Sequence, residues 1–148
     1  FAERVSVLAD GQILQTGTPE AVYQNPAHQF VGHFLGSPGM NFLPSNAFPH
    51  RLQRSFAEDG DPETIGFRPE SAGLTAPSEV LLSGIVETQR VLGTAQGRVV
   101  SMYGLRCGAA QVFVRSPASF AHGDEVGIAL QRWVGFREFL RVGSNGAE

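Results

Sequence analysis

The chain has 148 residues, a formal net charge of −3 and 42% hydrophobic residues, so one soluble domain with a buried core is the expected organisation. All eleven basic residues are arginine, and the lack of lysine excludes a Walker-type P-loop and Schiff-base chemistry, which both need a lysine amine. The acidic balance, with arginines spread along the sequence, argues against nucleic acid as a partner.

The cysteine count and the lengths of the apolar stretches indicate a soluble protein without disulfides. Cys107 is the single cysteine, so it forms no internal disulfide, and we interpret it as a small, partly buried strand residue. No apolar stretch approaches the roughly 20 residues that cross a bilayer. The sequence starts at Phe1 without an initiator methionine or a signal-peptide pattern, so we expect a soluble fragment of a longer protein.

The N-terminal quarter of the chain predicts a hairpin followed by two short helices. Apolar residues on both sides of Asp10-Gly11 flank a dipeptide that is typical of hairpin turns. Thr18 suits the N-cap of a short helix whose first residue is Pro19. A second helix is expected over residues 27–35, with aromatic and aliphatic pairs at i, i+4 spacing. These elements are too few to close a core, so we expect their apolar faces to pack on a larger body.

The next stretch, from residue 37 to residue 63, changes character after a short apolar strand at 40–43. Residues 44–63 are polar, rich in turn formers, and include an acidic cluster. We therefore predict a loop or a poorly ordered connection there.

From residue 64 onward the pattern indicates β-sheet. Short apolar segments are separated by Gly and Asp turns, and Leu92-Gly93-Thr94 is expected to turn the longest strand back. The pattern by itself supports a small barrel or sandwich, with a five-stranded OB-like roll as the natural candidate. The whole chain is thus predicted to be mainly β, with an N-terminal β-hairpin and two short helices. The expected strands cover residues 64–67, 80–92, 95–102, 112–114, 126–130 and 136–140.

Two motifs carry a resemblance to a known family. The first runs from DGQILQTGTPE at residues 10–20 to GSPGMNFLP at residues 36–44, and the second is IGFRPE at residues 65–70. In this order and separation they resemble the C-terminal part of sugar-type ABC importer ATP-binding proteins, in the maltose and glycerol-3-phosphate-like branch. The agreement weakens in the last strand, so no family role is carried over to it.

The resemblance implies a domain division and a role. Residues 1–36 would be the end of the nucleotide-binding domain, residues 37–63 a linker with a first strand, and residues 64–148 the transport-associated OB regulatory domain. ATP and Mg²⁺ would bind in the parent protein, and this fragment would hold no catalytic, cofactor-binding or metal site. The implied partners are a second ATP-binding subunit, in a homodimer, and the permease subunits at the cytoplasmic side of the bacterial inner membrane.

The expected function is therefore a non-catalytic regulatory and dimerisation region. We predict that the regulatory or dimer surface includes Gly66, Phe67, Arg68, Pro69, Glu70 and Gly93. A structural interpretation stands beside this one. In it, Arg68 and Glu70 form a surface turn with a local ion pair, and the two glycines serve backbone geometry.

A small-molecule sensor and an oligonucleotide binder are the two alternative functional classes. A domain that senses an oxyanion or a metabolite would need converging donors, to which Arg90, Arg98 and Arg106 are candidates. An oligonucleotide binder of the OB type needs aromatic residues among basic ones, and only Tyr103 lies near these arginines. The four histidines lack metal-ligand spacing, and the acidic cluster at 58–63 lacks the bidentate glutamate of a calcium loop.

Overall fold

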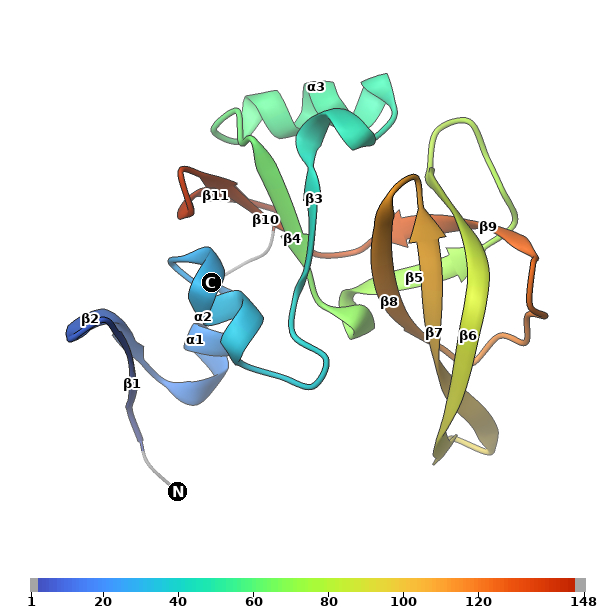
Figure 1. The fold of residues 1–148 in the computed structure, drawn as a ribbon, viewed down its shortest axis with the longest axis horizontal. Helices are drawn as coiled ribbons and strands as arrows, with labels where there is room; N and C mark the ends of the chain where they lie inside the picture. Colours follow the sequence, from blue (N-terminus) through green and yellow to red (C-terminus); the bar gives the residue numbers. More distant parts are fainter. Residues whose placement is uncertain (1–2, 146–148) are drawn as a thin grey trace.

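The computed structural model describes residues 3–145, so Phe1, on which part of the argument for a fragment rests, lies outside them. Within these residues, three short α-helices and two single 3-10 turns lie among strands, which are the commonest element (Figure 1). The mainly β prediction is confirmed. The helical elements are α1 Pro19–Gln24, α2 Gln29–Phe34, α3 His50–Glu58, η1 Ser45–Ala47 and η2 Pro69–Ser71.

The strands of the described residues form three antiparallel sheets. The two-stranded sheet is the hairpin of β1 Val5–Ala9 and β2 Gln12–Gly17. The four-stranded sheet has the order β11-β10-β4-β3, with β3 Asn41–Pro44, β4 Thr64–Phe67, β10 Val134–Arg137 and β11 Leu140–Ser144. The five-stranded sheet has the order β5-β9-β6-β7-β8, with β5 Ala72–Thr75, β6 Leu82–Ala95, β7 Arg98–Cys107, β8 Ala110–Ser116 and β9 Glu125–Leu130.

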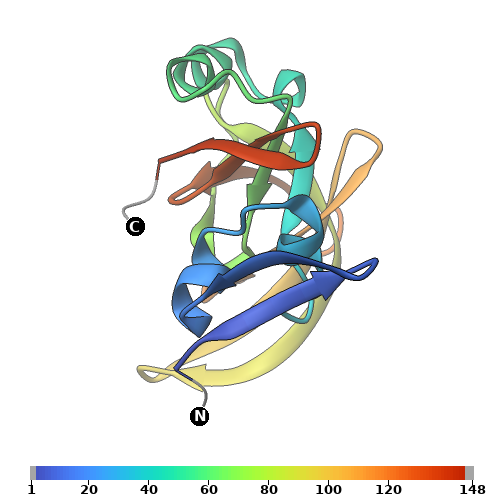
Figure 2. The ribbon, with the colours of Figure 1, turned by 90° about the vertical axis from the view of Figure 1, so that its left-hand side faces the viewer.

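The N-terminal hairpin and helices form as their turn and cap residues predict. Asp10 and Gly11 both have positive φ angles, 50° and 74°, as a type I′ hairpin turn requires. The Thr18 side chain accepts a hydrogen bond from the Ala21 amide at 3.2 Å and so caps α1, with Pro19 at its first position. Figure 2 shows this hairpin nearest the viewer with α1 and α2 behind it.

The N-terminal part has a small apolar cluster of its own. Val7, Val22 and Val31 are buried together, which ties the hairpin to both helices. Leu8 and Ile13 on the hairpin are about 60% exposed, so its other face is covered by nothing in the described part of the chain.

Residues 44–63 are not the irregular connection that their composition predicts. They form η1 and the nine-residue helix α3, so the loop prediction is wrong. Phe56 is 2% exposed and meets Trp133 edge-on, with 4.8 Å between ring centroids. Leu52 lies one turn earlier and packs against the same core. This single apolar stripe is buried against the sheets, and such tertiary packing stabilises a helix that is polar elsewhere.

The five-stranded sheet is the OB-like roll. It curls until its two edge strands, β5 and β8, contact each other, and Figure 1 shows the strands wrapping around a common centre. Its inward side chains join residues of β3, β4 and α3 in one large core. The sheet therefore has the shape that the short strands and Gly turns predict.

One predicted turn and one predicted strand differ from the structure. The β6–β7 hairpin reverses at Gln96 and Gly97, whose φ angles are 52° and 74°, and not at Leu92-Gly93-Thr94. Gly93 instead lies within β6, where the register with β7 shifts by a bulge. The predicted strand 136–140 is divided by a turn at Glu138 and Phe139 into β10 and β11.

Asn41 joins the four-stranded sheet to the five-stranded one. Its side-chain amide donates to the Phe113 carbonyl at 2.8 Å and accepts from the Phe113 amide at 2.8 Å. It also donates to the Phe67 carbonyl, and its side chain is buried. The amide thus pairs with edge strand β8 as another strand would, which satisfies backbone groups that are costly to leave alone.

Candidate functional site

Arg68, in the second family motif, joins the N-terminal helices to the β region. It follows β4 and is only 3% exposed. Its guanidinium donates to the carbonyls of Gly32 and Leu35 at the end of α2, at 2.8 and 2.5 Å. It also donates twice to the Tyr23 carbonyl in the last turn of α1, from Nη2 at 2.9 Å and from Nε at 3.3 Å. One side chain therefore satisfies carbonyls that the ends of two helices leave without intrahelical partners.

The electrostatics of this contact favour a buried cation. Helix C-termini carry partial negative charge, and the Arg68 guanidinium carbon lies 3.9 Å from the Tyr23 ring centroid, in a cation–π contact. The Tyr23 hydroxyl donates to the Glu70 carboxylate at 2.6 Å. Burial lowers the pKa of Arg68, while Tyr23 and Glu70 act in the opposite direction. Burial and the Glu70 hydrogen bond raise the pKa of Tyr23. We call Tyr23, Arg68 and Glu70 the Arg68 cluster.

The surface-turn interpretation of the second motif is wrong. Gly66, Phe67, Arg68 and Pro69 are all buried and Glu70 is half-buried. Within residues 3–145, Arg68 and Glu70 form no direct ion pair. The two family motifs instead fold onto each other. A Cβ on Gly66 would come within 2.5 Å of the Met40 sulfur, so only glycine allows this approach without displacement.

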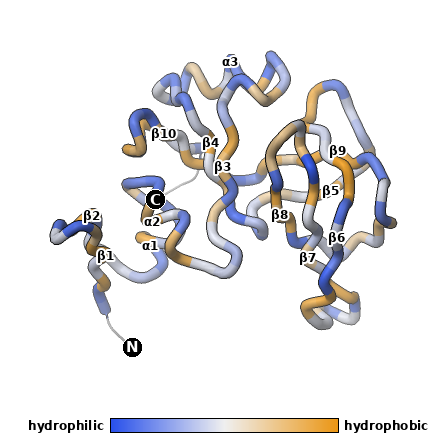
Figure 3. The backbone as a smooth tube through the Cα atoms, viewed as in Figure 1, coloured by the Kyte–Doolittle hydropathy of each residue, from blue (hydrophilic) through white to orange (hydrophobic). Residues whose placement is uncertain are grey.

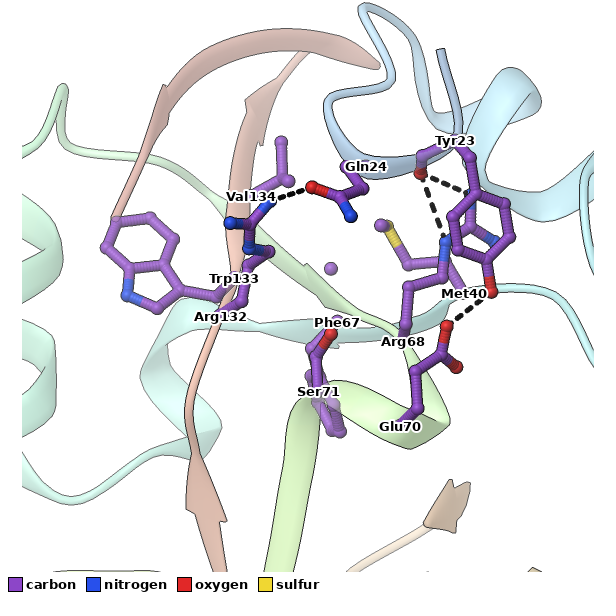
Figure 4. Close-up of a pocket in the computed structure, with 11 residues that line it drawn as sticks. Tyr23, Gln24, Met40, Phe67, Arg68, Glu70, Ser71, Arg132, Trp133 and Val134 are labelled. Atoms are coloured by element: carbon purple, nitrogen blue, oxygen red, sulfur yellow. Dashed lines mark hydrogen bonds between the residues drawn. The ribbon is translucent and has the colours of Figure 1, made fainter. Parts of the chain in front are cut away.

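A pocket of about 200 Å³ lies beside the Arg68 cluster, between α1, β4 and the connection from β9 to β10. Arg132 enters it from that connection, and its guanidinium donates to the side-chain oxygen of Gln24. Figure 4 shows Arg132 and Gln24 on one side of the pocket, with Arg68 and Glu70 on the other. Nothing in the local spacing of Gln24 or Arg132 marks them as site residues, because they lie 108 positions apart.

Gly93 lies in a different place from the other predicted site residues. It is exposed near the far end of the β6–β7 hairpin, beside a second hollow of about 450 Å³. Around it, Val91, Leu92 and Val99 are 63%, 41% and 54% exposed. Figure 3 shows this end of the hairpin as a hydrophobic segment that extends beyond its neighbours. We call these three residues with Gly93 the hairpin tip.

The arginines proposed for an oxyanion site are not gathered. Arg90 lines a cleft beside Pro38, and Arg106 pairs with Glu87 at 3.4 Å on the surface. Arg98 opposes Ala95 at the end of the hairpin. In the described residues, no group of three or more His, Cys, Asp or Glu side chains is arranged to hold a metal ion.

The chain is similar in sequence to bacterial import ATP-binding proteins. It is 36% identical over 117 residues to the sn-glycerol-3-phosphate import ATP-binding protein UgpC of Vibrio vulnificus. The aligned region covers 70% of this chain and 32% of that protein. It is 44% identical over 79 residues to the protein of the same name from Chromohalobacter salexigens, covering 47% of this chain and 21% of that protein.

A relative that is named for another solute shows the same kind of match. The alpha-glucoside transport ATP-binding protein AglK of Rhizobium meliloti is 32% identical over 109 residues, covering 63% of this chain and 30% of that protein. The chain thus spans about a third of the length of these curated relatives, or less. No protein-family model matches it. Among residues 3–145, every helix is too short or too polar to span a membrane.

Proposed function

The chain is homologous to the C-terminal part of sugar-type ABC importer ATP-binding proteins, and from this premise we propose that it is the non-catalytic regulatory and dimerisation region of such a subunit. In this proposal the solute is a sugar or a sugar phosphate, in line with the names of the relatives. ATP and Mg²⁺ bind elsewhere in the parent protein. The parent acts with permease subunits at the cytoplasmic side of the bacterial inner membrane.

The observation that carries the dimerisation role is the hairpin tip. Val91 and Val99 are more than half exposed on the two strands of one hairpin, and clustered exposed apolar side chains mark interaction surfaces. Two copies related by a two-fold axis would bury the same tip from each side. The predicted division at residues 36 and 63 stays part of the proposal, with the tip in the regulatory domain.

The Arg68 cluster supports the regulatory role. Its hydrogen bonds fix α1 and α2, which belong to the predicted end of the nucleotide-binding domain, to β4 and η2 of the regulatory domain. A dimer made through the hairpin tip would therefore hold two attached ATP-binding parts near each other. Such tethering raises the effective concentration of one for the other without any new catalytic contact. In this proposal, residues 66–70 contribute to regulation from inside the chain, by joining the two parts, and do not contact the second copy.

The test is the oligomeric state of the chain in solution, measured by size-exclusion chromatography with light scattering. We expect a concentration-dependent dimer, with a dissociation constant below about 100 μM. Val91→Asp should weaken it at least tenfold, because a carboxylate would be buried without a partner. Ile13→Asp is the matched control, since Ile13 is 63% exposed on the other hairpin, and it should leave the dimer unchanged.

Two results would contradict a dimer formed through the hairpin tip. A wild-type chain that stays monomeric at millimolar concentration would remove the dimerisation role. A Val91→Asp variant that unfolds at the wild-type urea concentration and dimerises as well as the wild type would move the interface away from the hairpin tip.

A further inference from the structure

The pocket beside the Arg68 cluster has the size of a small metabolite. Its volume of about 200 Å³ corresponds to about seven water molecules at roughly 30 Å³ each. That is below the 300–1,000 Å³ typical of sites for drug-sized ligands. The lining is polar on several sides, because it includes Gln24, Glu70, Ser71 and Arg132.

The charges in the pocket leave a positive excess at Arg132. Glu70 lies close enough to Arg68 to act on its ionisation, so those two charges offset each other. Arg132 uses one donor for the Gln24 side chain, while a guanidinium carries five. In the described part of the chain no carboxylate lies within ion-pair distance of it. A carboxylate or phosphate group is the partner that this free fork fits best.

The rest of the pocket lining offers partners for hydroxyl groups. One Glu70 oxygen accepts from Tyr23, and a carboxylate has several further acceptor sites. The Gln24 amide nitrogen and the Ser71 hydroxyl add a donor and a mixed donor–acceptor. Gln24 comes from α1, and Glu70 and Ser71 both come from η2, on different sides of one space (Figure 4). A bare anion would use only Arg132, and a polyanion would meet the negative charge of Glu70.

We infer that this pocket binds a small hydroxylated anion, with its carboxylate or phosphate on Arg132 and its hydroxyls on Glu70, Ser71 and Gln24. A sugar acid and a polyol phosphate share this chemistry. The inference rests on the pocket and not on dimerisation, so it stands or falls separately from the proposed function. Because α1 and the β9–β10 connection both line the pocket, a bound anion would strengthen the contact between them.

The wild-type chain provides its own reporter. Trp133 is the single tryptophan and lines the pocket, so its fluorescence can be titrated with defined probes. D-glycerate and sn-glycerol 3-phosphate carry both halves of the expected ligand and decide between the carboxylate and the phosphate. Glycerol, acetate and inorganic phosphate carry one half each. We expect saturable binding of at least one complete probe, at least tenfold tighter than of its separate halves.

Two variants make the site assignment falsifiable. Arg132→Met keeps the aliphatic stem and removes the charge, and should weaken the complete probe at least tenfold. Arg106→Met, at an arginine outside the pocket, should not change it. Glu70→Gln still accepts from Tyr23, and should lower the preference for glycerate over acetate at least fivefold.

Three results would overturn the inference. They are the absence of saturable binding by both complete probes, acetate or glycerol binding as tightly as glycerate, and an unchanged preference in a folded Glu70→Gln protein. Light scattering on the same samples reports the dimer independently, so a failed titration does not count against the proposed function.

Discussion

Arg68 and Val91 both have a solvent exposure that is unusual for their residue type, and they differ from the usual exposure in opposite directions. Arg68 is a charged side chain with 3% exposure, and Val91 is an apolar one with 63% exposure. Buried charges and exposed apolar patches are the informative departures from ordinary burial. The position of Arg68 is explained inside the chain, because its donors meet the carbonyl ends of two helices. The position of Val91 has no such explanation among the described residues, and it therefore points to a partner outside the chain.

The largest effect is expected from removing Arg68. Arg68→Met leaves the Tyr23 and Leu35 carbonyls without this donor, while the Gly32 carbonyl keeps its hydrogen bond from the Met40 amide. Each unsatisfied buried group costs about 1–3 kcal/mol. We expect a loss of about 3–5 kcal/mol in the free energy of unfolding by urea. Arg106→Met, at an exposed arginine, should change it by less than about 0.5 kcal/mol. A loss below about 1 kcal/mol for Arg68→Met would contradict this account, since the Arg68 cluster would then contribute little to stability.

A smaller effect is expected at the second buried polar contact. Asn41→Leu keeps the volume but leaves the amide and carbonyl of Phe113 unpaired at an edge strand, at a cost of about 2–3 kcal/mol. Asn46→Leu is the control, because Asn46 is exposed, and should change the unfolding free energy by less than about 0.5 kcal/mol. Equal losses in the two variants, measured by urea unfolding, would show that Asn41 does not hold the sheets together.

Alkaline pH should weaken the folded state through buried neutral groups. Burial raises the pKa of the Cys107 thiol from 9.0 to about 11, and the pKa of Tyr23 in the Arg68 cluster is also raised. The unfolded chain releases these protons first, so stability is complete below about pH 9 and falls as the pH rises toward 11. We expect a loss of about 1–2 kcal/mol from Cys107.

The pH experiment separates the two groups by substitution. Urea unfolding of Cys107→Ala and of the double variant with Tyr23→Phe, at several pH values, should show the fall reduced in the first and further reduced in the second. A fall of the same size in the double variant would mean that neither group is responsible.

The smallest effect on stability is expected at the hairpin tip. Val91→Asp changes a side chain that the monomer leaves in solvent, so the unfolding free energy of the dilute monomer should change by less than about 0.5 kcal/mol. Circular dichroism during urea unfolding at low protein concentration measures this. A loss above about 1.5 kcal/mol would show that Val91 is needed by the fold itself, and the contrast with Arg68 would disappear.

Sequence patterns predicted those elements that depend only on residues close together in the chain. The Asp10-Gly11 turn and the Thr18 cap needed only their neighbours, and both are confirmed. Helix α3 was missed because its apolar stripe is short and is stabilised by Trp133 from a distant part of the chain. The signal that was present is the i, i+4 pair of Leu52 and Phe56, which a polar composition obscured.

The candidate site was predictable only in part for the same reason. The motif around Arg68 was recognised, yet its partners lie 33 to 45 positions away, and no spacing rule connects them. Gly93 was chosen with the motif although the structure places it in another sheet. The interpretation of Gly93 as a backbone-geometry residue, by contrast, agrees with its position at a bulge.

The central claim is that two copies meet at their hairpin tips. A symmetric contact places residues near the axis close to their own copies, and Thr94 lies directly opposite Val99 of the hairpin tip. Thr94→Cys in a Cys107→Ala background therefore tests the claim by disulfide formation. The account predicts a covalent dimer on mild oxidation at concentrations where light scattering shows dimers, and none for Ile13→Cys in the same background. Dimers in solution that never cross-link through Thr94→Cys, or cross-link equally through Ile13→Cys, would contradict it.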